Sequence, residues 1–398
     1  MIKIQIHPIW RKHRGLISLL TYLVENNIDV KIVGGCVRDS LLGNKRIADF
    51  DIAVKATPST LKEYLSCKYK VIDIGIKFGS IKVVVNGDTF ELTSLRKDIR
   101  GSGRYPEKLE YGVCWLDDAK RRDFTINAIY SDLEGNIFDP LGGLKDLTLR
   151  RVKFIGCAEE RIKEDYLRIM RFFRFVAYLG DTCLCTDALH ACAKNREGLR
   201  RISGERLTDE FKKILSLSSP QYAISAMKHS GVMSSILEDN AFRILQYMIQ
   251  NEKLSGINNN VWLYRLAVII KQDINIDDIS FLKLSKSERY EANKIRSLLN
   301  KFATREYLVG ENIETSLILM CAKAALQYRL LTEGDIENTV LMSERKFPIE
   351  SRDIINLGYT GKKIGDSMKY LYHVWDEANG NVTKEELLSI AKDIIAKV

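Results

Sequence analysis

The sequence predicts an α/β (α+β) head with a mixed sheet over residues 1–150, followed by an all-helical remainder. Short apolar strands alternate with helices in the first part of the chain. Asn86-Gly87, flanked by alternating apolar residues, predicts a β-hairpin, because both residues accept the positive φ of a two-residue turn. From about Ala158 onward, apolar residues recur at helical spacing and strand signals fade.

Local signals predict the elements of the head. Apolar strands are expected over residues 29–35, 48–54 and 69–75, and the hairpin over 79–95. A helix over 36–43 ends at Gly43. A second helix over 57–67 begins with a Thr cap and has Pro58 at its first position.

Charge and composition narrow the class of protein. The 398 residues include 61 Lys and Arg against 52 Asp and Glu, a formal net charge of +9. Such a charge fits either a polyanionic partner or a Lys-rich soluble surface. The chain has no uninterrupted apolar stretch of about 18 residues, so no transmembrane helix and no membrane partner are expected. The first residues lack the apolar core of a secretory signal, so the eight cysteines are expected to be reduced and the location cytoplasmic.

The segment CLCTDALHAC, residues 183–192, holds three cysteines and His190. Such side chains can bind zinc. Their C-x-C and H-x-C spacings differ from the C-x2-C pairs of structural zinc sites. The segment therefore favours a packed helix with free thiols.

Two carboxylates, Asp49 and Asp51, interrupt the apolar strand ADFDIAV at residues 48–54. Strand alternation points both side chains to one face, where a divalent cation would relieve their repulsion, and oxygen ligands suit Mg²⁺. The alternative is an edge strand with a solvated face. Glu91, on a neighbouring strand, is either a third catalytic carboxylate or the partner of Arg96 or another local cation.

Residues 33–39, VGGCVRD, are expected at a strand-to-helix turn. Gly34 and Gly35 let a phosphate approach the backbone, and the forked guanidinium of Arg38 suits phosphate oxygens. A Gly-Gly pair also serves as a simple tight turn.

Residues 120–128, KRRDFTINA, predict a helix that carries Arg122, Asp123 and Asn127. These side chains form either a solvated charge run or an ordered set of donors for a triphosphate.

Residues 164–175, EDYLRIMRFFRF, predict an amphipathic helix. Asp165, Arg168, Arg171 and Arg174 recur every three residues and drift across one half of it, while apolar side chains fill the other half. The charged half is either a solvated face or a surface that reads a nucleotide.

Together and in this order, GGCVRD, DFD, RRDFTINA, FDPLGGLKDL and EDYLRIMRFFRF resemble the bacterial and eukaryotic class of CCA-adding tRNA nucleotidyltransferases. That family shares its polymerase β-like head with bacterial poly(A) polymerases. The resemblance is strong over residues 1–215 and looser in the C-terminal helices. It implies a catalytic head at 1–150, a nucleotide-recognition neck at 151–215, a helical body at 216–300 and a tRNA-binding tail at 301–398.

The resemblance also implies residue roles. Asp49 and Asp51 would hold two Mg²⁺ ions, and Glu91 is the candidate third carboxylate. The expected nucleotide-binding residues are Gly34, Gly35, Arg38, Arg122, Asp123, Asn127, Asp165, Arg168, Arg171 and Arg174. The 3′-hydroxyl of tRNA would attack the α-phosphorus of CTP or ATP in line, and pyrophosphate would leave.

Asp165 and Arg168 would select the base, because they offer an acceptor beside a donor. Cytosine and adenine present the complementary order, whereas guanine and uracil present the opposite one. The expected activity is the addition of C, C and A to tRNA. The alternatives are poly(A) synthesis, CC-only or A-only addition, and a non-catalytic RNA-binding protein. Residues 96–112 lie where the family has a flexible loop that helps the switch from C to A.

Overall fold

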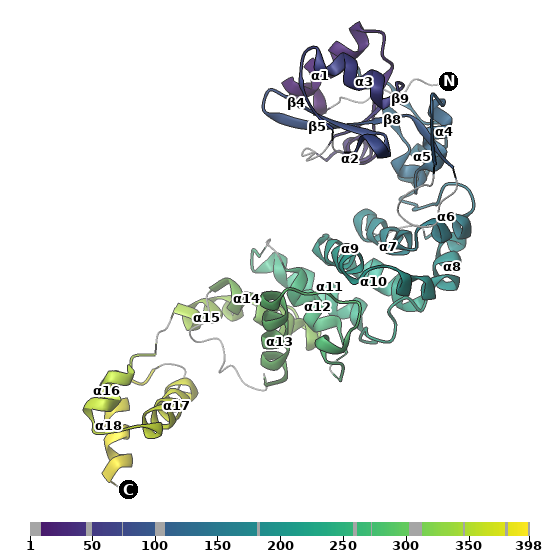
Figure 1. The fold of residues 1–398 in the computed structure, drawn as a ribbon. Helices are drawn as coiled ribbons and strands as arrows, with labels where there is room; N and C mark the ends of the chain where they lie inside the picture. The colour runs from purple at the N-terminus through teal and green to yellow at the C-terminus, as the bar shows by residue number, and fades with distance from the viewer. Residues whose placement is uncertain are drawn as a thin grey trace. The chain divides into compact units, whose positions relative to one another are not determined.

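The computed structural model describes residues 9–44, 50–73, 75–99, 108–180, 184–257, 261–271, 273–301, 313–344, 347–378 and 381–396. They form two compact units. The first comprises Met1–Ile214 and Ala226–Ser234, and the second comprises Leu215–Ser225 and Ser235–Val398. The first unit contains a sheet with helices, whereas the second is helical throughout its described part (Figure 1). An α+β head followed by helical segments is therefore confirmed, while the division into four domains stays a prediction.

A seven-stranded mixed sheet organises the head. The described part of the head contains nine strands, seven of them in this sheet: β1 (Val30–Val33), β2 (Asp51–Val54), β3 (Lys70–Ile72), β4 (Ser80–Val85), β5 (Asp88–Ser94), β6 (Arg96–Ile99), β7 (Lys108–Tyr111), β8 (Tyr130–Ser131) and β9 (Ile137–Phe138). Their order in the main sheet is β3-β4-β5-β2-β1-β8-β9, and β6 pairs with β7 in a separate small sheet. Strands β2 and β5 are parallel, and the other neighbouring pairs are antiparallel.

The predicted hairpin and central strands are confirmed. Strands β4 and β5 meet at Asn86 and Gly87, whose φ angles are 54° and 90°. In β2, Ile52 and Val54 are buried, whereas Asp51 is exposed at the first position of the strand. The core therefore begins directly after the carboxylate, which stays available to solvent.

The helices of the first unit pack around this sheet and continue beyond it. They are α1 (Arg14–Glu25), α2 (Gly35–Leu41), α3 (Pro58–Ser66), α4 (Trp115–Arg121), α5 (Gly143–Thr148), α6 (Ala158–Glu164), α7 (Leu167–Leu179), α8 (Thr186–Lys194) and α9 (Gly204–Ser216), with short 3₁₀ turns η1 (Ile9–Lys12), η2 (Ile76–Phe78), η3 (Thr125–Asn127) and η4 (Arg196–Arg201). As predicted, Thr57 caps α3, accepting a hydrogen bond from the amide of Thr60 at 3.2 Å.

The continuous helix predicted over residues 120–128 is wrong. Helix α4 ends at Arg121, and Arg122 is extended, with φ −70° and ψ 166°. The next residues pair with a distant segment instead: the Ile155 amide donates to the Asp123 carbonyl at 3.1 Å, and the Thr125 amide to the Lys153 carbonyl at 3.0 Å. These long-range hydrogen bonds replace the local ones that a helix needs.

The segment 96–112 differs in part from a simple loop. Its two ends pair as β6 and β7, with Arg96 opposite Tyr111 and Ile99 opposite Lys108. Residues 100–107, where the loop was expected, lie outside the described residues.

The helices of the second unit are α11 (Ala241–Leu254), α12 (Trp262–Ile269), α13 (Lys286–Lys301), α14 (Ile313–Leu326), α15 (Glu333–Glu344), α16 (Ser351–Asn356), α17 (Lys362–Glu377) and α18 (Lys384–Ala396), with the turn η5 (Ile276–Asp278). Helix α10 (Pro220–His229), like α9, has residues in both units. The last three helices share an apolar core that includes Ile354, Leu371, Trp375 and Leu387. None of the helices in the described ranges has the length and hydrophobicity needed to cross a bilayer.

Candidate active site

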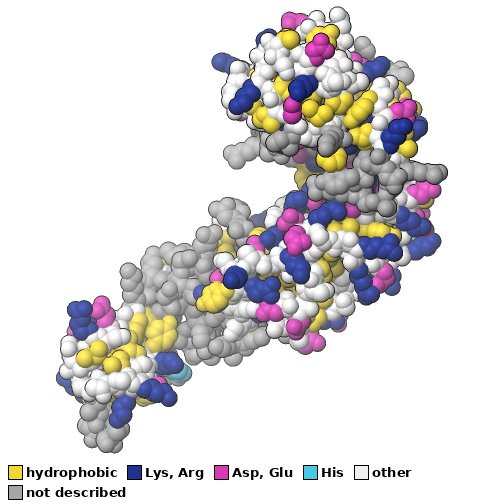
Figure 2. All heavy atoms as spheres, in the orientation of Figure 1, with side chains coloured by type: hydrophobic (Ala, Val, Ile, Leu, Met, Phe, Trp, Pro, Cys, Tyr) yellow, Lys and Arg dark blue, Asp and Glu magenta, His cyan; other side chains and the backbone are white. Residues whose placement is uncertain are grey.

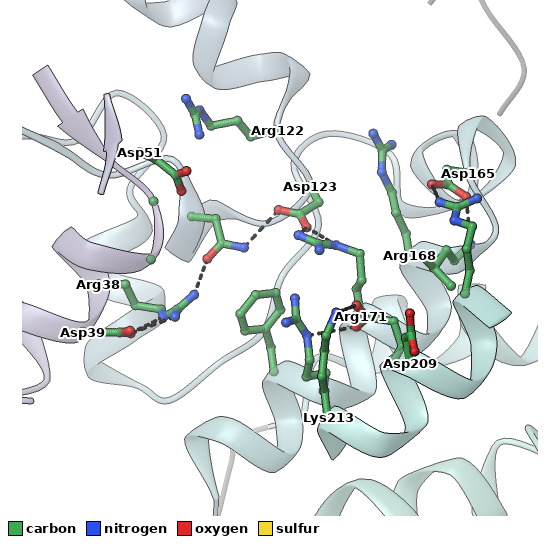
Figure 3. A pocket seen from close by; sticks show the side chains of 18 of the residues that line it. Arg38, Asp39, Asp51, Arg122, Asp123, Asp165, Arg168, Arg171, Asp209 and Lys213 are labelled. Atoms are coloured by element: carbon green, nitrogen blue, oxygen red, sulfur yellow. Dashed lines mark hydrogen bonds and ion pairs between the residues drawn. The ribbon is translucent and has the colours of Figure 1, made fainter. Parts of the chain in front are cut away.

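A cavity of about 960 Å³ opens in the first unit (Figure 3). Its walls come from the turn before α2, the start of β2, the segment after α4, and helices α7 and α9. The charged residues that line it are Arg38, Asp39, Asp51, Arg122, Asp123, Asp165, Arg168, Arg171, Arg174, Arg206, Asp209, Glu210 and Lys213. The ten residues predicted to bind nucleotide all lie on this cavity, although they come from three separate sequence segments.

Gly34 has a steric reason to be glycine. Its φ is 77°, which disfavours other residues. A Cβ there would lie 3.2 Å from an Asp51 carboxylate oxygen and 3.8 Å from the Asn127 carbonyl. At Gly35 a Cβ would meet the Arg38 guanidinium at an ordinary 3.7 Å. The close approach of α2 to β2 thus depends on Gly34.

A chain of hydrogen bonds joins α7 to α2 across the cavity floor. The Arg171 Nε donates to Asp123 at 2.8 Å, and the Asn127 amide donates to the other Asp123 oxygen at 3.0 Å. The Asn127 oxygen in turn accepts from Arg38 at 2.7 Å. Arg38 also pairs with Asp39 at 2.7 Å. Residues that the sequence separates widely are therefore fixed relative to one another (Figure 3).

Asp123 is ionised at the centre of this chain. Burial opposes its ionisation, but the charge of Arg171 and the hydrogen bonds from Asn127 and Arg171 outweigh burial and lower its pKa to about 2. Asp123 is therefore an anion at neutral pH, and it orients Arg171 and Asn127.

Arg122 is held by a second cluster. Its guanidinium donates to Asp118 at 3.1 Å and to the Tyr130 hydroxyl at 3.2 Å. The Tyr130 hydroxyl donates to Asp118 at 2.8 Å. Burial opposes the ionisation of Asp118, but Arg122 and Arg121 lower its pKa overall. Asp118 and Tyr130, which the sequence pattern did not indicate, thus fix the direction of Arg122.

The sequence predicted that Asp165 lies on the same helix as the arginines. The structure places it before that helix. Its backbone is extended between α6 and α7, with φ −151° and ψ 108°. One of its oxygens accepts from the Leu167 amide at 3.1 Å, which satisfies the free backbone donor at the start of α7. The other oxygen accepts from Arg206 at 2.8 Å. Asp165 and Arg168 line the same cavity, but each has a different protein partner.

Helix α9 supplies residues that the sequence reasoning missed. Glu210, which is 4% exposed, pairs with Arg174 at 3.0 Å and with Lys213 at 3.1 Å. The residues of α9 that line the cavity are Arg206, Asp209, Glu210 and Lys213. They are spaced i, i+3, i+4 and i+7, which places them on one face of the helix. This charged spacing was the sequence signal that could have identified them.

Two carboxylates on neighbouring strands, Asp51 at the start of β2 and Glu91 on β5, are of a kind that suits a divalent cation. Asp49 lies outside the described residues. Asp51 is in register with Glu91 on the neighbouring parallel strand, both are exposed, and both line a second cavity of about 460 Å³. Glu91 lies 3.7 Å from the Lys82 ammonium, so its local cation is Lys82 rather than Arg96. Exposed carboxylate oxygens are donors that Mg²⁺ prefers.

In the described ranges, which omit Asp49 and Cys183, no three His, Cys, Asp or Glu side chains gather as a metal site. The segment after Cys183 forms helix α8, and Cys185 and Cys192 are free thiols. The helix predicted for this segment is therefore confirmed in its described part.

Two family models match the chain. Residues 30–153 match the poly A polymerase head domain, and residues 184–242 match the probable RNA and SrmB-binding site of polymerase A. Among solved structures, the Bacillus stearothermophilus CCA-adding enzyme in complex with CTP has a TM-score of 0.71 at 24% identity, covering 98% of this chain and 99% of that one. The Thermotoga maritima CCA-adding enzyme complexed with tRNA has a TM-score of 0.69 at 20% identity, covering 99% and 100%.

Some sequence relatives cover nearly the whole chain and others cover about half of it. The mouse protein named mitochondrial CCA tRNA nucleotidyltransferase 1 is 32% identical over 396 residues, which is 95% of this chain and 90% of the relative. A CCA-adding enzyme of Lactobacillus johnsonii is 38% identical over 224 residues, which is 55% and 54% of the two chains. With such similarity along both chains, the protein belongs to the CCA tRNA nucleotidyltransferase family.

Proposed function

We propose that the protein adds C, C and A to the 3′ end of tRNA, using CTP and ATP and releasing pyrophosphate. The observation that carries the proposal is the single cavity lined by all ten residues that the resemblance assigns to nucleotide binding. The names of the mouse and Lactobacillus johnsonii relatives support it further.

In this proposal, the arginines of the cavity bind the triphosphate. Arg38 is held by Asp39 and Asn127, and Arg122 by Asp118 and Tyr130, so both guanidinium groups are oriented before the substrate arrives. Pre-ordered donors lose little conformational freedom on binding, which favours both affinity and alignment of the α-phosphate.

Enzymes of this family normally use divalent metal ions. We assign Mg²⁺ to Asp49 and Asp51, with Glu91 as a third carboxylate. Bound Mg²⁺ would supply positive charge to the α-phosphate and lower the pKa of the attacking 3′-hydroxyl. The three carboxylates would hold the ions at the start of β2, near Gly34 and the arginines proposed to bind the triphosphate.

Base selection is assigned to Asp165 and Arg168. Their present partners are Arg206 and Glu164, at 2.8 Å for the first pair. A cytosine or adenine edge would satisfy an acceptor and a donor in this part of the cavity, whereas guanine or uracil would leave both unpaired. An unpaired buried polar group costs about 1–3 kcal/mol.

A direct experiment is to supply tRNA that lacks its 3′ CCA with CTP, ATP or both, and to sequence the products. Addition of C, C and then one A supports the proposal. Long A tails would indicate a poly(A) polymerase, and additions that stop after CC or require a preformed CC end would indicate the partial enzymes. RNA binding without any addition would indicate a binding protein.

We also propose a cytoplasmic location. The mouse and human relatives are named mitochondrial, so cell fractionation with markers for both compartments is the appropriate test.

A further inference from the structure

Three side chains on one face of α7 converge on Arg38, which α2 carries and which is only 7% exposed. They are Arg171, Phe175 and Tyr178, spaced i, i+4 and i+7. The ring centres of Phe175 and Tyr178 lie 5.0 and 4.7 Å from the guanidinium carbon of Arg38, within cation–π distance. Arg171 reaches Arg38 through the chain of hydrogen bonds across the cavity floor. The direction of this guanidinium therefore depends on α7.

Tyr178 also holds Arg38 through Asp39. One Asp39 carboxylate oxygen accepts from the Arg38 Nε at 2.8 Å and pairs with its Nη2 at 2.7 Å (Figure 3). The Tyr178 hydroxyl donates to the same oxygen at 2.6 Å, and the Asn44 amide donates to that hydroxyl at 2.7 Å. Burial and the carboxylate of Asp39 raise the pKa of Tyr178 to about 12, so the hydroxyl remains a donor at neutral pH.

We propose that Tyr178 is a positioning residue for triphosphate binding. Its ring and its hydroxyl fix the Arg38 guanidinium from two directions, one directly and one through Asp39. Tyr178 is not among the described residues that line the cavity, so it acts through Arg38 rather than on a ligand. This inference rests on the proposed function, because it assumes that Arg38 binds the triphosphate.

The two contacts of Tyr178 can be removed one after the other. Tyr178→Phe keeps the ring beside Arg38 and removes the hydrogen bond to Asp39. Tyr178→Leu removes both contacts and leaves an apolar side chain in their place. A comparison of the two variants therefore separates the hydroxyl from the ring.

Tyr22 on α1 offers a matched control, because it makes the same two kinds of contact elsewhere in the head. Its hydroxyl donates to the Tyr64 carbonyl at 2.9 Å, and the Lys68 ammonium lies 4.7 Å from the centre of its ring. Tyr22→Phe and Tyr22→Leu thus remove a similar hydroxyl and a similar ring without touching Arg38.

The test is calorimetric titration of the full chain, with Mg²⁺ present, with inorganic pyrophosphate, CTP and UTP. Pyrophosphate has no base, so it reports on the phosphate donors alone. An unfolded fraction lowers the number of sites and leaves the dissociation constant unchanged, so a loss of stability alone would not imitate the effect. We expect Tyr178→Phe to weaken the binding of pyrophosphate and CTP about fivefold, as the loss of one hydrogen bond commonly does. Tyr178→Leu should weaken both about threefold further, through the lost cation–π contact.

The ratio of the CTP and UTP affinities should stay at the wild-type value in both Tyr178 variants, and the two Tyr22 variants should keep all three dissociation constants. In an Arg38→Lys background, Tyr178→Phe should have little further effect, because the forked donor that Tyr178 orients is already lost. Wild-type pyrophosphate affinity in both Tyr178 variants, or an equal loss in the Arg38→Lys background, would overturn the inference. A wild-type protein that binds neither pyrophosphate nor CTP would instead contradict the proposed function.

Discussion

Two arginine–carboxylate pairs, one in each unit, have the same chemistry and different surroundings. In the first unit, Arg171 donates to Asp123 at 2.8 Å, and its side chain is 33% exposed on the cavity. In the second, Arg265 donates to Glu252 at 3.2 Å and is 6% exposed. Arg265 also donates to the carbonyls of Leu215 and Leu217, at 2.6 and 2.7 Å.

The surroundings give the two carboxylates opposite pKa shifts. The pKa of Asp123 falls to about 2, because Arg171 and Asn127 outweigh its burial. Burial raises the pKa of Glu252, and Arg265 only partly offsets it. The first pair keeps one side open to a ligand, whereas the second is enclosed by helices and backbone carbonyls. We infer that the first pair serves binding and the second holds the fold together.

The largest expected effect concerns the chemistry of the first unit. Asp51→Ala should lower nucleotide transfer roughly 10³-fold or more, because a carboxylate proposed to hold Mg²⁺ is lost. Asp49→Ala should behave in the same way. Single-turnover incorporation of CTP measures the loss, and gel-shift binding of tRNA should change little. Near-normal transfer in either variant would show that the two-metal assignment is wrong.

Breaking the ion pair of the second unit should lower stability and leave nucleotide transfer unchanged. Arg265→Met leaves Glu252 and two carbonyls without their donor, and breaking a buried ion pair costs about 3–5 kcal/mol of unfolding free energy. Urea unfolding measures this loss. Transfer per folded molecule should remain at the wild-type level, and Glu252→Gln is a milder variant should Arg265→Met not fold. A selective loss of nucleotide affinity in the folded variant would contradict a purely structural role.

Asp123 and Glu252 should affect the pH dependence of the unfolding free energy in opposite directions. Asp123 has a usual pKa of 3.8 and a folded value of about 2, so it contributes about 2 kcal/mol of stability above pH 4, which is lost as the pH falls toward 2. Asp123→Asn should therefore flatten the acid limb of the stability curve between pH 4 and 2.

Glu252 should act in the reverse direction. Its folded pKa lies above the usual value of 4.5, so its contribution to stability is greatest at low pH and declines as the pH rises through that range. Glu252→Gln should remove this decline. Urea titrations of the wild type and the two variants across the pH range measure how the free energy of unfolding depends on pH. The difference between the wild type and each variant gives the contribution of that residue. Contributions that change with pH in the same direction would refute the contrast.

Local signals predicted much of this fold. The Asn86-Gly87 turn, the Thr57 cap and the helix of Arg168, Arg171 and Arg174 were readable because each depends on neighbouring residues. The break after Arg121 was not readable, since it depends on hydrogen bonds to residues 153–155.

The same difference applies to the candidate site. The sequence predicted which residues line it, but not which side chains they pair with. Asp165 pairs with Arg206, and Arg122 is held by Asp118 and Tyr130, through contacts that only the folded chain creates. On the face shown in Figure 2, Lys and Arg are scattered among Asp and Glu, so net charge alone does not locate the nucleotide site.

In the proposed function, the cavity of the first unit binds nucleotides and discriminates between their bases. Calorimetric titration of the full chain with CTP, ATP, GTP and UTP, in the absence of RNA, tests this discrimination directly. We expect CTP and ATP to bind at least about tenfold more tightly than GTP and UTP, as one or more unpaired buried groups would impose. In Asp165→Ala the four affinities should converge. Equal affinities in the wild type, or unchanged selectivity in Asp165→Ala, would contradict the account.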